Sequence, residues 1–101
     1  MEFDKLIVRP NAKKHLSEIF EYYKDIDEEL AQRFFKEVIS CLEYIEQNPL
    51  FFQKRYQEIR ICFTNVFPYG IYYCIKETPK LKKKRIYVLS ILHTKRRIKY
   101  K

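Results

Sequence analysis

The first part of the chain alternates between apolar and polar positions with the period of a helix. Residues 3–8, which end in the apolar run Leu6-Ile7-Val8, predict a short strand. Pro10, which lacks a backbone N–H, suits the first turn of a helix. The apolar residues that follow at spacings of three and four are Ala12, Leu16, Ile19, Phe20 and Tyr23. This spacing predicts a helix that buries one face.

A second helix is predicted after a short link at residues 24–27. Asp27 is a suitable N-cap for it, and Pro49 forbids its continuation beyond Asn48. Its apolar stripe consists of Leu30, Phe34, Val38, Cys41, Leu42 and Ile45. Because the link between the two helices is so short, we expect them to form an antiparallel hairpin.

Beyond Pro49 the apolar positions alternate in twos, which is typical of strands. Strands are predicted at residues 59–64, 67–76 and 85–93, with a polar turn at residues 77–84. In the last strand we expect one face to hold Ile86, Val88, Ser90 and Leu92, and the other to hold Tyr87, Leu89, Ile91 and His93. Both faces are largely apolar, so this strand is predicted to be central in the sheet.

The predicted order of elements is β-α-α-β-β-β, in a single domain that spans residues 1–101. A sheet needs one face covered, and the helical hairpin supplies that cover. We therefore predict the α+β class: a helical hairpin packed on a small, mainly antiparallel four-stranded sheet. The chain has 101 residues, of which 47% are hydrophobic, and this is enough for one core.

The charge of the chain is strongly asymmetric. The formal net charge is +8, and residues 59–101 hold 12 of the 21 basic residues but only one of the 13 acidic ones. Such a cationic region attracts polyanions, which can be nucleic acid or an acidic protein segment. Self-repulsion within it destabilises a compact chain, so we expect an anionic partner.

The cysteines of the chain do not indicate a metal site. Cys41, Cys62 and Cys74 are odd in number and lack Cys-x-x-Cys spacing, which argues against a disulfide framework and against structural zinc. We expect all three to be buried apolar residues. No cofactor is expected either. The charged N-terminal residues contain no long apolar run, so we expect a cytoplasmic protein with no membrane partner.

Six short motifs occur along the chain in the order that a known family shows. They are Tyr22-Tyr23, Leu30-Ala31-x-Arg33-Phe34, Ile45-x-x-Asn48-Pro49, Tyr56-x-x-Ile59-Arg60, Phe67-Pro68-Tyr69-x-Ile71-x-Tyr73 and Ile91-x-His93-x-x-Arg96. Together with the element order, they make the chain resemble the RelE/ParE superfamily of toxins across nearly its whole length. Each motif alone is weak, and the set is specific for the superfamily rather than for one branch.

The resemblance implies a toxin of a type II toxin–antitoxin system, of the plasmid-stabilisation type. Its partner would be a cognate antitoxin with an acidic or amphipathic C-terminal segment, which the cationic region suits. One branch of the superfamily cleaves messenger RNA on the ribosome. Another branch, which is ParE-like, blocks DNA gyrase without known catalytic residues of its own.

Candidate residues for RNA cleavage are present. Metal-independent cleavage needs a base, an acid and cations that stabilise the phosphorane. His93 could act as acid or base, Arg60 could clamp a phosphate, and Tyr100 could stack on a base or relay a proton. The candidates for binding a partner or nucleic acid are Arg60, Lys95, Arg96, Arg97 and Lys99.

One departure favours the ParE-like branch. In the RNA-cleaving branch an Arg commonly follows the Tyr of the middle strand, whereas here Gly70 follows Tyr69. We therefore favour a gyrase inhibitor, with a ribosome-dependent, metal-independent endoribonuclease as the alternative and a non-toxic nucleic-acid-binding module as a second alternative. Structural roles stay open as well: Arg60 could only pair with Glu58 or Glu77, His93 could be a hydrogen-bonded strand end, and His15 is expected on the surface.

Overall fold

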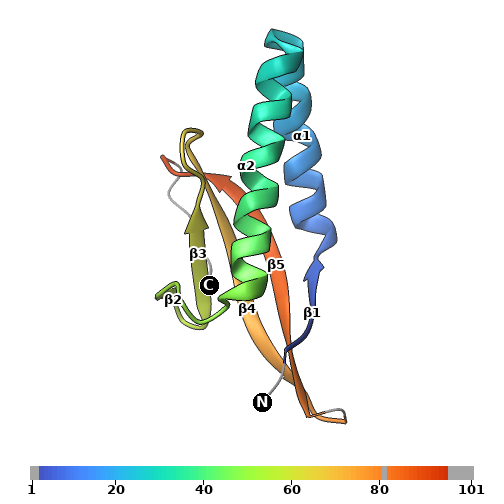
Figure 1. Ribbon diagram of the computed structural model, residues 1–101, viewed down its shortest axis with the longest axis vertical. Coiled ribbons are helices and arrows are strands. Elements are labelled where there is room, and N and C mark those ends of the chain that lie inside the picture. The colour runs from blue at the N-terminus through green and yellow to red at the C-terminus, as the bar shows by residue number, and fades with distance from the viewer. Residues whose placement is uncertain (1–2, 81, 96–101) are drawn as a thin grey trace.

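A computed structural model describes residues 3–80 and 82–95, and Figure 1 shows how their elements are arranged. Strand β1 (Phe3–Val8) leads into helix α1 (Pro10–Ile26), which has Pro10 in its first turn. Helix α2 (Glu28–Gln47) follows after Asp27 alone, and the Asp27 side chain accepts a hydrogen bond from the Glu29 N–H at 3.1 Å. The predicted helical hairpin is confirmed, with a shorter link because α1 continues to Ile26.

Four further strands follow the hairpin. They are β2 (Lys54–Tyr56), β3 (Ile59–Phe63), β4 (Tyr69–Thr78) and β5 (Lys83–His93). The strand order in the sheet is β1-β5-β4-β3-β2, with β1 parallel to β5 and the other neighbours antiparallel. The α+β class and the central position of β5 are confirmed. The sheet has five strands rather than four, because three-residue β2 is too short to show an alternating pattern.

The core lies between the helices and one face of the sheet. Both helices lie on the same side of the sheet, and the tip of their hairpin extends beyond the strand ends (Figure 1). The largest fully buried side chains come from α2, β4 and β5. They include Phe34, Val38, Ile45, Ile71, Tyr73, Ile86, Val88 and Ile91. We call this side of the sheet the covered face and the other side the open face.

A β-bulge in β5 corrects the predicted faces of that strand. Tyr72 pairs with Ser90 and Tyr73 pairs with Val88, so Leu89 is an extra residue opposite this pair. An extra residue shifts the alternation of side chains by one position. Val88 and Ile91 therefore both join the core, and the prediction that Ser90 and Leu92 share a face with Val88 is wrong.

The three cysteines are free and buried, as the sequence predicted. Cys41 of α2 and Cys62 of β3 belong to the core, whereas Cys74 alternates with core residue Tyr73 along β4 and so lies on the open face. Across the described ranges, no helix combines the length and apolar character that crossing a membrane requires.

Candidate functional site

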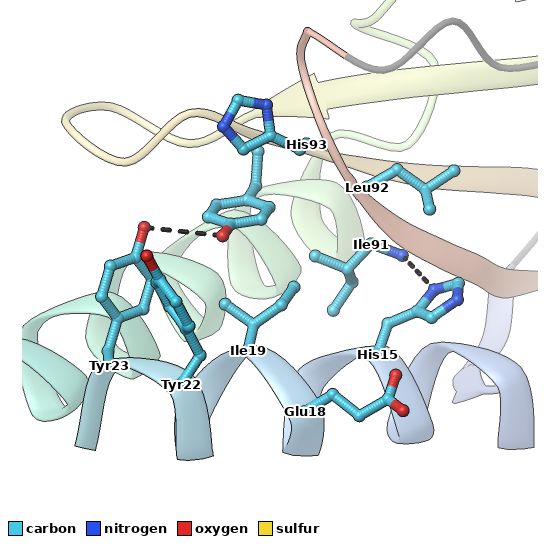
Figure 2. A pocket seen from close by; sticks show the side chains of 9 residues that line it. His15, Glu18, Ile19, Tyr22, Tyr23, Ile91, Leu92 and His93 are labelled. Atoms are coloured by element: carbon cyan, nitrogen blue, oxygen red, sulfur yellow. Dashed lines mark hydrogen bonds between the residues drawn. The ribbon is translucent and has the colours of Figure 1, made fainter. Parts of the chain in front are cut away.

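A pocket of about 370 Å³ lies between α1 and the C-terminal end of β5. Figure 2 shows side chains of α1 pointing toward those of β5 across it. The residues that line the pocket are His15, Glu18, Ile19, Tyr22, Tyr23, Tyr69, Ile91, Leu92 and His93. Of the residues proposed from the sequence as catalytic, His93 is the one that lines this pocket. Those contributed by α1 were not predicted as site residues.

His93 is held at the pocket by contacts of its ring and by a backbone hydrogen bond of the next residue, Thr94. The Thr94 N–H donates to the Pro68 carbonyl at 2.8 Å, which ties the end of β5 to the start of β4. The ring of His93 meets that of Tyr69 edge-on, with centroids 5.3 Å apart. The Lys95 N–H donates to His93 Nδ1 at 3.1 Å. Because Nδ1 accepts this bond, the neutral ring carries its proton on Nε2.

His15 is half-buried against the sheet, and its expected place on the surface is therefore wrong. The Ile91 N–H donates to His15 Nδ1 at 3.2 Å. Strand β1 ends at Val8, which pairs with Val88, so it does not reach this part of β5. His15 of α1 therefore accepts a hydrogen bond from a backbone N–H of β5 that β1 does not reach. Because Nδ1 is the acceptor, the neutral ring of His15 also carries its proton on Nε2.

Tyrosines connect the pocket to the core. The Tyr23 hydroxyl lies 3.5 Å from the Tyr69 hydroxyl, at the outer limit of a hydrogen bond, and Tyr23 also packs against the rings of Phe34 and Phe67. Tyr22 is largely exposed at the rim. The pocket therefore presents imidazole, phenol and one carboxylate, which can exchange protons and donate hydrogen bonds. None of the described residues lining it is a Lys or Arg.

Arg60 lies far from this pocket. It pairs with Tyr73 across β3 and β4, whereas His93 pairs with Tyr69, four residues away along β4. That separation is about 13 Å along the strand, with β4 itself between the two residues. The Arg60 Nη1 donates to the Phe52 carbonyl. The structure therefore does not bring Arg60 and His93 together around one phosphate.

Among the described residues, Arg60 forms neither of the ion pairs considered for it, with Glu58 or with Glu77. Glu58 pairs with Lys54, with 3.0 Å between Lys54 Nζ and Glu58 Oε1. Glu77 and Lys84 line the same shallow pocket as Arg60. The other proposed site residues fall elsewhere: Lys95 is exposed beside His93, and Tyr100, Arg96, Arg97 and Lys99 lie outside the described residues.

Gly70 is required by space rather than by backbone conformation. Its φ is not positive, but a Cβ built there would lie 2.9 Å from Ile61 Cγ2 and 3.3 Å from Phe63 Cε1. Gly70 pairs with Phe63 in the β3–β4 ladder and lies on the open face, one residue after Tyr69 of the covered face. A larger side chain at this position would displace its neighbours on β3.

A basic and an acidic cluster of described residues lie at opposite ends of the molecule, which measures 46 Å along its longest axis. Near the turn that joins β4 and β5 lie Lys76, Lys80, Lys82, Lys83, Lys84 and Arg85, which we call the basic turn. The tip of the helical hairpin carries Asp25, Asp27, Glu28 and Glu29. Figure 1 shows the β4–β5 turn and the hairpin tip at the two ends of the long axis.

The chain is similar to known proteins in family and in fold. The family model described as "ParE toxin of type II toxin-antitoxin system, parDE" matches residues 6–98. Among solved structures, the chain is similar to one titled "Chromosomal ParDE TA system from P. aeruginosa", with 17% identity and a TM-score of 0.74, covering 90% of this chain and 96% of that chain. At this identity the likeness is one of fold. No curated protein sequence matches the chain.

Proposed function

The chain belongs to the ParE family of toxins of type II toxin–antitoxin systems, and from this membership we propose that it stops growth by binding DNA gyrase and is neutralised by a cognate acidic antitoxin. The observation that carries the proposal is the family match, which extends over residues 6–98. Both the target and the antitoxin would meet the toxin in the cytoplasm.

The surface of the chain suits an acidic partner that also has apolar residues. The basic turn offers six cations within a short stretch of surface, and complementary charge speeds association and orients the partner. A groove between α2 and β3 exposes apolar rings, with Phe51 68% and Tyr44 43% exposed. We call it the aromatic groove, after the rings of Tyr44, Phe51 and Phe52, which contact one another there. Exposed apolar patches of this kind are typical of interaction sites.

The arrangement of the candidate catalytic residues favours binding over RNA cleavage. Stabilising a phosphorane needs a cation close to the acid or base. His93 lines a pocket without Lys or Arg among its described residues, and Arg60 lies at the other side of β4. Gly70 stands where the RNA-cleaving branch commonly has an Arg, and a side chain there would require Ile61 to move, because its Cβ would lie 2.9 Å from Ile61 Cγ2.

The target is tested by inducing the toxin and following the synthesis of DNA, RNA and protein by pulse-labelling. We expect DNA synthesis to stop first and the DNA-damage response to rise. Purified toxin should inhibit supercoiling by purified gyrase, and its neighbouring acidic gene product should relieve the inhibition. Normal supercoiling at saturating toxin, together with an early arrest of translation, would overturn the gyrase proposal.

Charge variants test how the antitoxin binds. Changing Lys82 and Lys83 to Glu should weaken antitoxin binding at least tenfold at low salt, and high salt should reduce the difference because it screens exposed charges. The matched control changes Lys14 and Lys36, two exposed helical lysines, to Glu. Equal losses for both pairs would mean that overall charge, and not the basic turn, governs binding.

Ribosome-dependent cleavage of messenger RNA is the second candidate because His93 does line a pocket with a tautomer that leaves Nε2 as a donor. In that case translation would stop first, messages would be cut within codons, and His93→Ala would reduce cleavage at least tenfold. Growth unaffected by induction, combined with strongly salt-dependent binding to DNA or RNA, would instead support a nucleic-acid-binding module that is not a toxin.

A further inference from the structure

Two of the three cysteines approach each other from different elements. Cys41 lies on α2 and Cys62 on β3, and both line the aromatic groove. Cys62 is the residue directly before Phe63 in β3. The sulfur of Cys41 lies 3.6 Å from the Phe63 carbonyl oxygen. The Cys41 sulfur therefore lies beside the segment of β3 that carries Cys62, and both cysteines face the same groove.

The groove gives small molecules a route to this pair. It has a volume of about 450 Å³ and opens to solvent. Cys41 is 9% exposed and Cys62 is 4% exposed, so Cys41 is the more accessible of the two. Cys74 differs from both, since it lies on the open face, next to Arg9, Lys76 and Tyr87. It therefore provides a natural comparison for the reactivity of the pair.

The greater exposure of Cys41 points to it as the nucleophile, and the electrostatics of the pair agree. The hydrogen bond from Cys62 lowers the pKa of Cys41, although burial and the nearby Glu37 carboxylate act in the opposite direction. The same hydrogen bond and burial raise the pKa of Cys62. Because the thiolate is the reactive form, Cys41 is the side chain that would attack first.

We propose that Cys41 and Cys62 form a thiol pair that hydrogen peroxide oxidises to an intramolecular disulfide. The Cys41 thiolate attacks one peroxide oxygen, the O–O bond breaks, and the departing hydroxide takes up a proton to leave as water. The sulfenic acid on Cys41 is then attacked by the sulfur of Cys62, its S–O bond breaks, and a second water leaves with the Cys62 proton. Two thiols and one peroxide thus give one disulfide and two waters.

The product would join α2 to β3 beneath the aromatic groove. Both cysteines line that groove with Tyr44, Phe51 and Phe63, so the bond fixes the distance between its two walls. Oxidation would therefore act on a surface where apolar rings are exposed. This inference rests on the two thiols alone and holds whatever the target of the toxin is.

The test uses the reduced full-length chain, treated with one equivalent of hydrogen peroxide and quenched with N-ethylmaleimide. We expect the loss of two of the three free thiols, a peptide that joins Cys41 to Cys62 in the mass spectrum, and full reversal by dithiothreitol. Disulfides that join separate chains, disulfides that include Cys74, or three thiols that stay free would overturn the proposal. Mapping of the wild-type chain requires no variant to fold.

Variants separate the two steps. Cys74→Ser is the matched control and should form the same crosslink as the wild type. Cys62→Ser should stop at the sulfenic acid on Cys41, which dimedone traps, and Cys41→Ser should give neither product. A dimedone adduct on Cys62 rather than Cys41 in these variants would contradict the assigned order of attack.

Discussion

The two faces of the sheet are stabilised in different ways. On the covered face, side chains of α2, β4 and β5 such as Phe34, Tyr73 and Val88 are fully buried in one continuous core. On the open face, rings lie near the guanidinium groups of arginines: Arg9 lies 5.9 Å from the ring of Tyr87, and Arg55 lies 5.9 Å from that of Phe63. Burial therefore holds the fold on one side, while the other side combines apolar rings with positive charge.

The largest expected effect tests this difference directly. Phe34→Ala removes a ring that packs against Tyr23, Phe67 and Tyr69, and should lower the free energy of unfolding by about 3–5 kcal/mol, because it leaves a cavity in the core. Urea denaturation measures the loss. Phe63→Ala, at the half-exposed ring of the open face, should cost only about 1 kcal/mol. Similar costs for the two changes would break the comparison.

A second prediction concerns packing on the open face itself. Gly70→Ala should lower the free energy of unfolding by about 1–3 kcal/mol, because the new Cβ would lie 2.9 Å from Ile61 Cγ2, which sits on a stiff β-branched side chain. Denaturation of the single variants and of Gly70→Ala combined with Ile61→Ala measures the effect. We expect the double variant to lose less than the two single losses together. Additive losses would show that Ile61 is not the residue that excludes a side chain.

The sequence predicted the helices and the central strand well because their signals are local. Asp27 can be recognised as an N-cap, and the stripe from Leu30 to Ile45 has a single period over many residues. Strand β2 gave no such signal, since three residues cannot establish an alternation. The bulge at Leu89 was equally hidden, because both faces of β5 are apolar and neither register leaves a polar residue conspicuously misplaced.

The candidate site was less predictable because it depends on how elements meet. His15 stands between charged helical residues and looks like a surface residue, but its hydrogen bond to Ile91 follows from the point where β1 ends against β5. The separation of Arg60 from His93 depends on the register of three strands. Single residues of the right chemistry could be chosen from the sequence, but their distances could not.

A third prediction returns to the covered face and to pH. Tyr73→Phe removes the hydrogen bond from the Tyr73 hydroxyl to the Pro49 carbonyl, which is 2.8 Å long, and should cost about 1 kcal/mol at neutral pH. Burial raises the pKa of Tyr73 to about 12. A pKa raised in the folded state stabilises the fold below the unfolded value of about 10, and this stability is lost as pH rises toward 12.

Stability measured by urea denaturation from neutral pH to pH 12 checks the sign. The wild type should lose more stability than Tyr73→Phe over the alkaline part of this range. Its Tyr73 hydroxyl ionises at a lower pH in the unfolded chain than in the folded one, and Tyr73→Phe has no such group. The difference between the two curves isolates Tyr73 from the other tyrosines. Parallel curves would mean that the hydroxyl is as well solvated in the folded chain as in the unfolded one.

The smallest expected effect decides whether cations and rings on the open face are energetically coupled. Arg9 precedes α1 as its N-cap but makes no side-chain capping bond, so Arg9→Gln removes the cation without removing a cap. The contact with Tyr87 should contribute about 0.5–1 kcal/mol, as expected for an exposed cation–π pair. A double-mutant cycle of Arg9→Gln and Tyr87→Leu measures this coupling by urea denaturation. A coupling of zero would mean that the Arg9 charge does not stabilise Tyr87, and that this charge is available to an anionic partner.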